Sequence, residues 1–129
     1  MGVEEIDFEE YARDYASNCY LLDTSTLLWL IAEPERLSNA ANAIWRDPDR
    51  MIAVSVISYW EIAIKKEKLG IHDVAHFWED RVAPYADLET LQVREEHVVE
   101  LLLLPKLHKD PFDRMLIAVS RREYAFGDF

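Results

Sequence analysis

The sequence predicts an α/β domain built on a mostly parallel sheet, and two observations support this prediction. A short apolar run, 20–22, stops at Asp23 and is followed by a pattern with helical spacing over 24–32. The same order recurs where the apolar run 51–54 precedes Ser55 and a second helical pattern, 57–69. Because strands that alternate with helices usually pair in parallel, both runs are expected in one sheet.

The remaining elements follow from capping residues and spacing. Residues 1–18 are acidic and are expected to form a short helix or a loosely held arm ahead of the domain, 19–129. Ser38 fits the cap of a helix over 39–46, and Gly70 closes the helix 57–69. The sequence further predicts an amphipathic helix over 73–83, a short strand over 88–93, a helix over 95–104 and a last helix beginning at Pro111. The four tryptophans, Trp29, Trp45, Trp60 and Trp78, lie on apolar helix faces, which predicts core positions.

Composition limits the class of protein. A chain of 129 residues, half of them hydrophobic, with three glycines and no low-complexity tract, indicates a single globular domain. The single Cys19 excludes an internal disulfide and a cysteine-based zinc site. No apolar run approaches the ~18 residues of a membrane span, and the amino terminus is acidic. We therefore expect a cytoplasmic protein without a membrane segment.

The net charge of −11 argues against a protein that binds nucleic acid through broad neutralisation of phosphates. It does not exclude an enzyme that acts on nucleic acid, because clustered carboxylates attract phosphate once divalent cations occupy them.

Three carboxylates stand at or near predicted helix starts, and each has a purely structural alternative. Asp23 follows the first strand, where it either caps the next helix or lies in the crevice at the sheet edge. Glu61 fits a capping box with Ser58, but it lies nearly two turns inside the helix if that helix begins at Ser55. Asp113 falls in the first turn after Pro111, where an acid is favourable even without a function.

Asp110 fits the cap of the same last helix, which is its preferred interpretation. Asp23, Glu61 and Asp113 would repel one another in a shared cleft unless a cation joined them. Hard oxygen ligands without cysteine or paired histidine point to Mg²⁺ or Mn²⁺, and such a site suits phosphoryl transfer to water. Aspartyl phosphotransfer is a further alternative, although Ser25 stands where the D-x-D-x-T pattern has its second aspartate.

Three segments, LLDTSTLLWL, AVSVISYWEIAIKKEKLGI and LPKLHKDPFDRMLIAVS, resemble PIN-domain ribonucleases, in particular the VapC-type toxins of bacterial toxin–antitoxin pairs. The resemblance extends over about 20–122. It implies a three-layer αβα sandwich, metal-dependent endonucleolytic cleavage of RNA, a protein antitoxin that covers the site, and commonly a homodimer.

The resemblance also assigns roles to residues. It implies that Asp23, Glu61 and Asp113, with Asp110 beside them, hold the metal ion. Two cations are candidates for contact with RNA phosphate, Lys65 and Arg114; each is equally well read as a solvated helix charge.

The chain departs from the family pattern at both ends. It carries residues 1–18 ahead of the first strand, and it ends at residue 129 without the further strand and fourth acid that the resemblance leads one to expect. Asp128 is not preceded by a strand pattern. The alternative to an active ribonuclease is therefore a catalytically impaired PIN-like protein, with its last strand missing, that serves as a protein-binding module.

Overall fold

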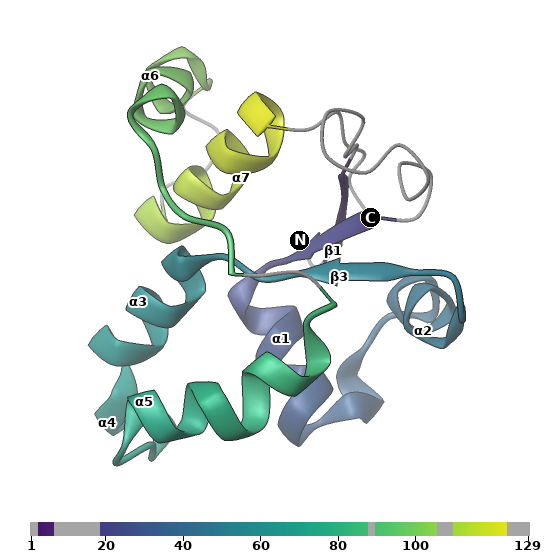
Figure 1. Cartoon of the computed structure of the whole chain (residues 1–129). Helices are drawn as coiled ribbons and strands as arrows, with labels where there is room; N and C mark the ends of the chain where they lie inside the picture. The colour runs from purple at the N-terminus through teal and green to yellow at the C-terminus, as the bar shows by residue number, and fades with distance from the viewer. Residues whose placement is uncertain (1–2, 7–18, 88–89, 106–109, 124–129) are drawn as a thin grey trace.

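A small sheet forms the centre of the chain. The computed structural model describes residues 3–6, 19–87, 90–105 and 110–123. Their strands are β1 (Val3–Ile6), β2 (Cys19–Leu22) and β3 (Met51–Ala53), in the order β1-β2-β3. β2 and β3 are parallel, whereas β1 is antiparallel to β2 (Figure 1). The α-helices are α1 (Thr24–Ala32), α2 (Asn39–Arg46), α3 (Val56–Ile64), α4 (Lys66–Leu69), α5 (Val74–Phe77), α6 (Glu95–Leu103) and α7 (Pro111–Glu123).

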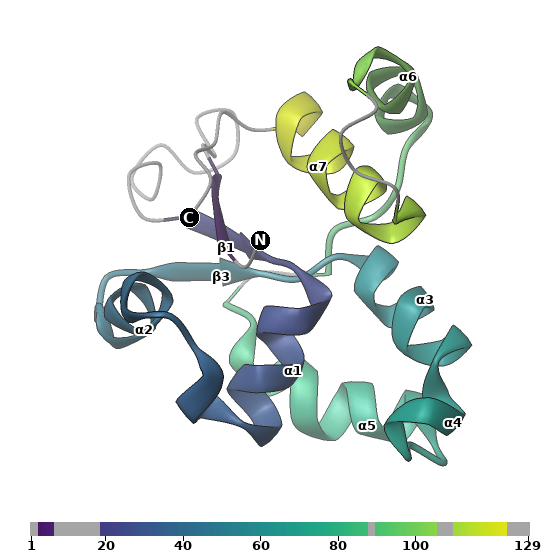
Figure 2. The same cartoon turned by 180° about the vertical axis from the view of Figure 1, so that it is seen from behind.

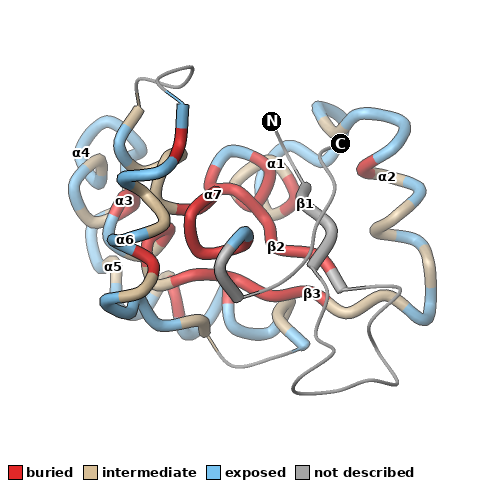
Figure 3. The backbone as a smooth tube through the Cα atoms, turned by 90° about the horizontal axis from the view of Figure 1, so that it is seen from above, coloured by how far each residue is buried: buried red, intermediate tan, exposed pale blue. Residues whose placement is uncertain are grey.

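Helices cover both faces of this sheet, as the predicted three-layer αβα class requires. Side chains alternate between the faces of a strand, and Tyr20, Leu22 and Ile52 enter one core with residues of α1 and α3. The intervening Leu21 and Ala53 enter a second core with Leu116 of α7 and Ile57 of α3. Figures 1 and 2 show α1, α3 and α5 on one side of the strands and α6 and α7 on the other. Figure 3 shows the buried part of α7 beside β2 and β3.

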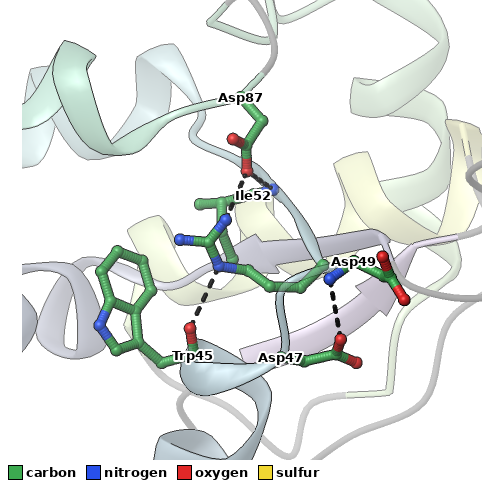
Figure 4. Close-up of polar contacts among 6 residues, drawn as sticks. Trp45, Asp47, Asp49, Ile52 and Asp87 are labelled. Carbon is green, nitrogen blue, oxygen red and sulfur yellow. Dashed lines mark hydrogen bonds and ion pairs between the residues drawn. The ribbon is translucent and has the colours of Figure 1, made fainter.

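The outer edge of β3 is bonded to the segment that follows α5. This segment passes through two short helical turns, η3 (Trp78–Val82) and η4 (Ala83–Tyr85). The Asp87 carboxylate accepts hydrogen bonds from the Ile52 amide at 2.8 Å and from the Arg50 guanidinium at 3.3 Å (Figure 4). Further along, Leu91 forms a parallel bridge with Ser55. The strand predicted over 88–93 is thus represented by this bridge, and residues 88–89 lie outside the described residues.

Capping residues place most helix ends where the sequence predicts them. Ser38 accepts a hydrogen bond from the Ala41 amide at the start of α2, as expected of a cap. Gly70 ends α4 in the left-handed conformation at φ 72°, which favours glycine. The predicted continuous helix 57–69 is interrupted at Lys65, which separates α3 from α4.

Two predictions about structure are wrong. Residues 3–6 form a strand rather than a helix or a loose arm, because pairing with β2 satisfies backbone groups that an open sheet edge leaves unpaired. Trp60 is not in the core, since it is 56% exposed, whereas Trp78 is buried as expected. Residues 7–18 and 124–129 lie outside the described residues, so the extension 1–18, the domain 19–129 and the missing last strand stay predictions.

In the part of the chain that the structure describes, no helix is long and apolar enough to cross a membrane.

Candidate functional site

Asp23 lies where β2 passes into α1, and it is both a helix cap and a buried acid. Its Oδ1 accepts a hydrogen bond from the Thr26 amide at 2.8 Å, and the residue is only 6% exposed. Desolvation by burial raises the pKa of Asp23 to about 6, although hydrogen bonding from Thr26 opposes this rise. The negative charge of Asp113 raises the pKa further. Asp23 therefore caps α1 and also shares an electrostatic environment with an acid from α7.

Glu61 is placed by the start of α3, which decides between the two interpretations of this residue. Ser55 is the cap of α3 and accepts from the Ile57 amide at 3.0 Å. Glu61 consequently lies nearly two turns inside the helix, and a capping box with Ser58 is excluded. Ser58 instead accepts a hydrogen bond from the Thr24 hydroxyl at 2.9 Å, which joins α3 to the first turn of α1.

The Glu61 carboxylate is buried, with 7% of the residue exposed, and only half of it has a described partner. Its Oε2 accepts a hydrogen bond from Lys65, one turn further along the helix. Its Oε1 is a buried oxygen without a hydrogen-bond partner among the described residues. A buried carboxylate oxygen without a donor is costly, so this atom is suited to a cationic ligand.

The first turn of α7 supplies two more acids. Asp110 caps the helix as predicted, because its Oδ1 accepts from the amides of Phe112 at 2.8 Å and Asp113 at 3.1 Å. Asp113 follows within the first turn, where an acid interacts favourably with the helix dipole.

Lys65 shows that the acids of α3 and α7 lie close together. The hydrogen bond to Glu61 is the main cause that raises the pKa of Lys65, and the charges of Asp110 and Asp113 add to it. The charge of Asp113 therefore acts both on Asp23 at the start of α1 and on Lys65 at the end of α3. Among the described residues, however, no three acidic, histidine or cysteine side chains already surround a common point as metal ligands.

The Arg114 side chain makes a structural contact between α7 and α6. Its guanidinium donates hydrogen bonds to the carbonyl oxygens of Pro105 at 2.9 Å and Leu101 at 3.3 Å, which ties α7 to the end of α6. Lys65 is 39% exposed and lies within the acidic site. The roles of Lys65 and Arg114 in RNA binding stay predictions.

The aromatic pair beside the acids was missed from the sequence. Trp60 packs on Phe112 of α7 in a T-shaped contact, with ring centroids 4.9 Å apart and an interplanar angle of 73°. Neighbouring residues on a helix point about 100° apart, so Trp60 points outward because the structure buries Glu61, and the sequence near Trp60 gives no separate signal of this direction. We call Trp60 and Phe112 the aromatic ledge.

Carboxylates gathered at helix starts beside a parallel sheet, without cysteine or paired histidine, are typical of enzymes that use a hard divalent cation for phosphoryl transfer. The comparison with known families agrees, since the PIN domain family matches residues 20–125. The chain belongs to this family, whose members are generally metal-dependent nucleases. No curated protein and no solved structure gives a significant match.

Proposed function

We propose that this PIN-domain protein is a metal-dependent endoribonuclease that acts in the cytoplasm as the toxin of a type II toxin–antitoxin pair of the VapC type. One observation carries the proposal: Glu61 is buried inside α3, and its Oε1 has no hydrogen-bond partner among the described residues. In addition, the charge of Asp113 acts on Asp23, and the charges of Asp110 and Asp113 act on Lys65, which pairs with Glu61. These interactions between acids from distant parts of the sequence support the single shared site that a metal-dependent nuclease requires.

The donor set fits Mg²⁺ or Mn²⁺. Every candidate ligand is a carboxylate, and the Glu61 Oε1 atom lacks a hydrogen-bond partner among the described residues. We propose that Asp23, Glu61 and Asp113 hold the ion, with Asp110 beside them. When bound, the ion would supply positive charge that activates water and stabilises the charge on the phosphate.

The protein side chains contribute positioning. Asp110 orients the first turn of α7 through its two amide hydrogen bonds. Lys65 donates a hydrogen bond to one Glu61 oxygen and its side chain is 39% exposed, and we propose that its ammonium also contacts a phosphate of the substrate. Arg114 is occupied by backbone carbonyls, and we propose that it contributes to RNA binding by keeping α7 in place.

A cleavage assay with a matched control tests this function. Single-stranded RNA incubated with Mg²⁺ or Mn²⁺ should be cut by the wild-type protein and left intact by Asp23→Asn. The control is Asp73→Asn, because Asp73 also caps a helix, α5, through the His76 amide but is not one of the acids of the site. Equal cleavage by wild type and Asp23→Asn would contradict the proposal.

We also propose a protein partner, an antitoxin, and a homodimer. The support is an apolar surface on α6, where Val98, Val99, Leu102 and Leu103 are exposed. Expression of the chain alone in bacteria should arrest growth, and Asp23→Asn should relieve the arrest. A catalytically impaired binding module, the alternative, would leave growth unaffected in both cases.

A further inference from the structure

Trp60 is exposed although it directly precedes a buried residue. It is 56% exposed, Glu61 next to it is 7% exposed, and Ile64 one turn further is 64% exposed. Tryptophan is usually highly buried, because its large apolar surface is costly in water. An exposed tryptophan next to the buried Glu61 is therefore unusual and suggests a role connected with the candidate site.

The aromatic ledge fixes this ring without covering it. Phe112 contacts the Trp60 ring in a T-shaped arrangement, with ring centroids 4.9 Å apart. The Phe112 amide is in turn bonded to Asp110, so the turn of α7 that carries Asp113 also supports the ledge. This contact leaves Trp60 56% exposed, and it reduces the orientational freedom that a ligand would otherwise have to remove.

A cation lies over the Phe112 ring of the ledge. The Lys65 ammonium is 5.5 Å from the centre of the Phe112 ring, and it pairs with Glu61. The site thus presents, side by side, an open aromatic surface, a cation and carboxylates suited to a divalent ion. These groups match the parts of a nucleotide: a flat base that stacks, and a phosphate that binds cations.

We propose that Trp60, supported by Phe112, stacks on an unpaired base of the RNA next to the site of cleavage and thereby selects single-stranded segments. The proposal rests on the proposed ribonuclease function. Stacking on an aromatic side chain requires a free base face, which a nucleotide inside a duplex does not offer.

A second copy of this chain is the competing occupant, because Trp60 and Ile64 form a small apolar surface. The proposed homodimer has another apolar surface available on α6, where Val98, Val99, Leu102 and Leu103 are exposed. Continuity with the acids and with Lys65 favours the nucleotide. The oligomeric state is accordingly one outcome of the test.

The test measures binding and cleavage separately on the full chain. Affinity is measured by fluorescence anisotropy with a labelled 12-nucleotide single-stranded RNA, with Ca²⁺ in place of Mg²⁺ so that the RNA stays intact; cleavage is measured with Mg²⁺ or Mn²⁺. Trp60→Leu should weaken binding about 5- to 150-fold, the range expected for one stacked base, and Trp60→Phe should retain most of it. The control Trp29→Leu, at the far end of α1 where Arg36 lies over the ring, should bind like wild type. A hairpin duplex should bind equally weakly to all variants.

The possible outcomes distinguish failure of the Trp60 stacking role from failure of the proposed ribonuclease function. If wild type cleaves RNA and Trp60→Leu binds as tightly as wild type, the stacking role is overturned and the ribonuclease function stands. If wild type neither binds nor cleaves RNA, both fail. If Trp60→Leu converts a dimer to a monomer in light scattering without a change in RNA affinity, the ledge is an interface between copies and the stacking role is overturned.

Discussion

The substitution Asp23→Asn should stabilise the metal-free protein at neutral pH. Desolvation by burial raises the pKa of Asp23 from 3.8 to about 6, so the folded protein disfavours its charged form. A shift of roughly two units corresponds to about 3 kcal/mol, at about 1.4 kcal/mol per unit. Asparagine keeps an oxygen that accepts from the Thr26 amide, so the cap of α1 survives. The variant should therefore gain up to about 3 kcal/mol in the free energy of unfolding at pH 7.5.

The sign of the pH dependence of the free energy of unfolding shows whether the raised pKa of Asp23 causes the difference in stability. Between pH 3.8 and about 6 the folded protein binds more protons at Asp23 than the unfolded chain does. The contribution of Asp23 to the free energy of unfolding consequently falls as pH rises through this window and stays constant above it. Below pH 3.8 the carboxyl is protonated in both states, so the difference between wild type and Asp23→Asn should disappear.

Urea unfolding in EDTA, followed by tryptophan fluorescence from pH 3.5 to 7.5, measures this difference directly. Titrating groups that do not interact with Asp23 contribute equally in both proteins, so their contributions cancel when the two curves are subtracted. Adding Mn²⁺ should narrow the gap, because a bound cation offsets the buried charge in wild type alone. A variant that is no more stable than wild type at pH 7.5, or a difference that does not vary with pH, would refute the reasoning.

Two further predictions concern the sheet edge and the ion pair of the site. Asp87→Ala leaves the Ile52 amide without its acceptor and should lower the free energy of unfolding, measured with urea, by about 1–3 kcal/mol. The control Asp47→Ala removes only the exposed hydrogen bond from the Asp49 amide. It should change the free energy of unfolding by less than about 0.5 kcal/mol. Lys65→Met removes the cation that pairs with Glu61, so Mn²⁺ no longer competes with an ammonium for this carboxylate. Mn²⁺ should therefore raise the melting temperature of Lys65→Met more than that of wild type, as measured by differential scanning fluorimetry. An equal or smaller rise in the variant would contradict this.

The sequence predicts local features of this fold well because local rules determine them. The cap at Ser38, the left-handed Gly70 and the start of α7 at Pro111 each follow from a single residue with a strong preference. The strand 3–6 does not follow from any single residue, because its partner β2 supplies the hydrogen bonds that define it. Pairing across the chain is a tertiary effect, and an acidic composition gives no signal for it.

The same distinction applies to the candidate site. Spacing alone left Glu61 open between a capping box with Ser58 and a place deeper in the helix, since both residues satisfy the box pattern. The cap of α3 at Ser55 shows that Glu61 lies deeper in the helix and forms no capping box. The outward direction of Trp60 depends on that same helix start and on the packing of Phe112 from α7, and neither is encoded near Trp60 in the sequence.

Glu61 carries more weight for the metal site than the other acids do. Asp23 and Asp110 each accept backbone hydrogen bonds at a helix start, so each would be favourable in a protein without any metal. Asp113 gains from the dipole of α7 in the same way. Glu61 has no such local reason, because it lies inside α3, is buried, and leaves Oε1 without a hydrogen-bond partner among the described residues. Lys65 offsets its charge on one oxygen only, and a divalent cation is the ligand that would satisfy the other.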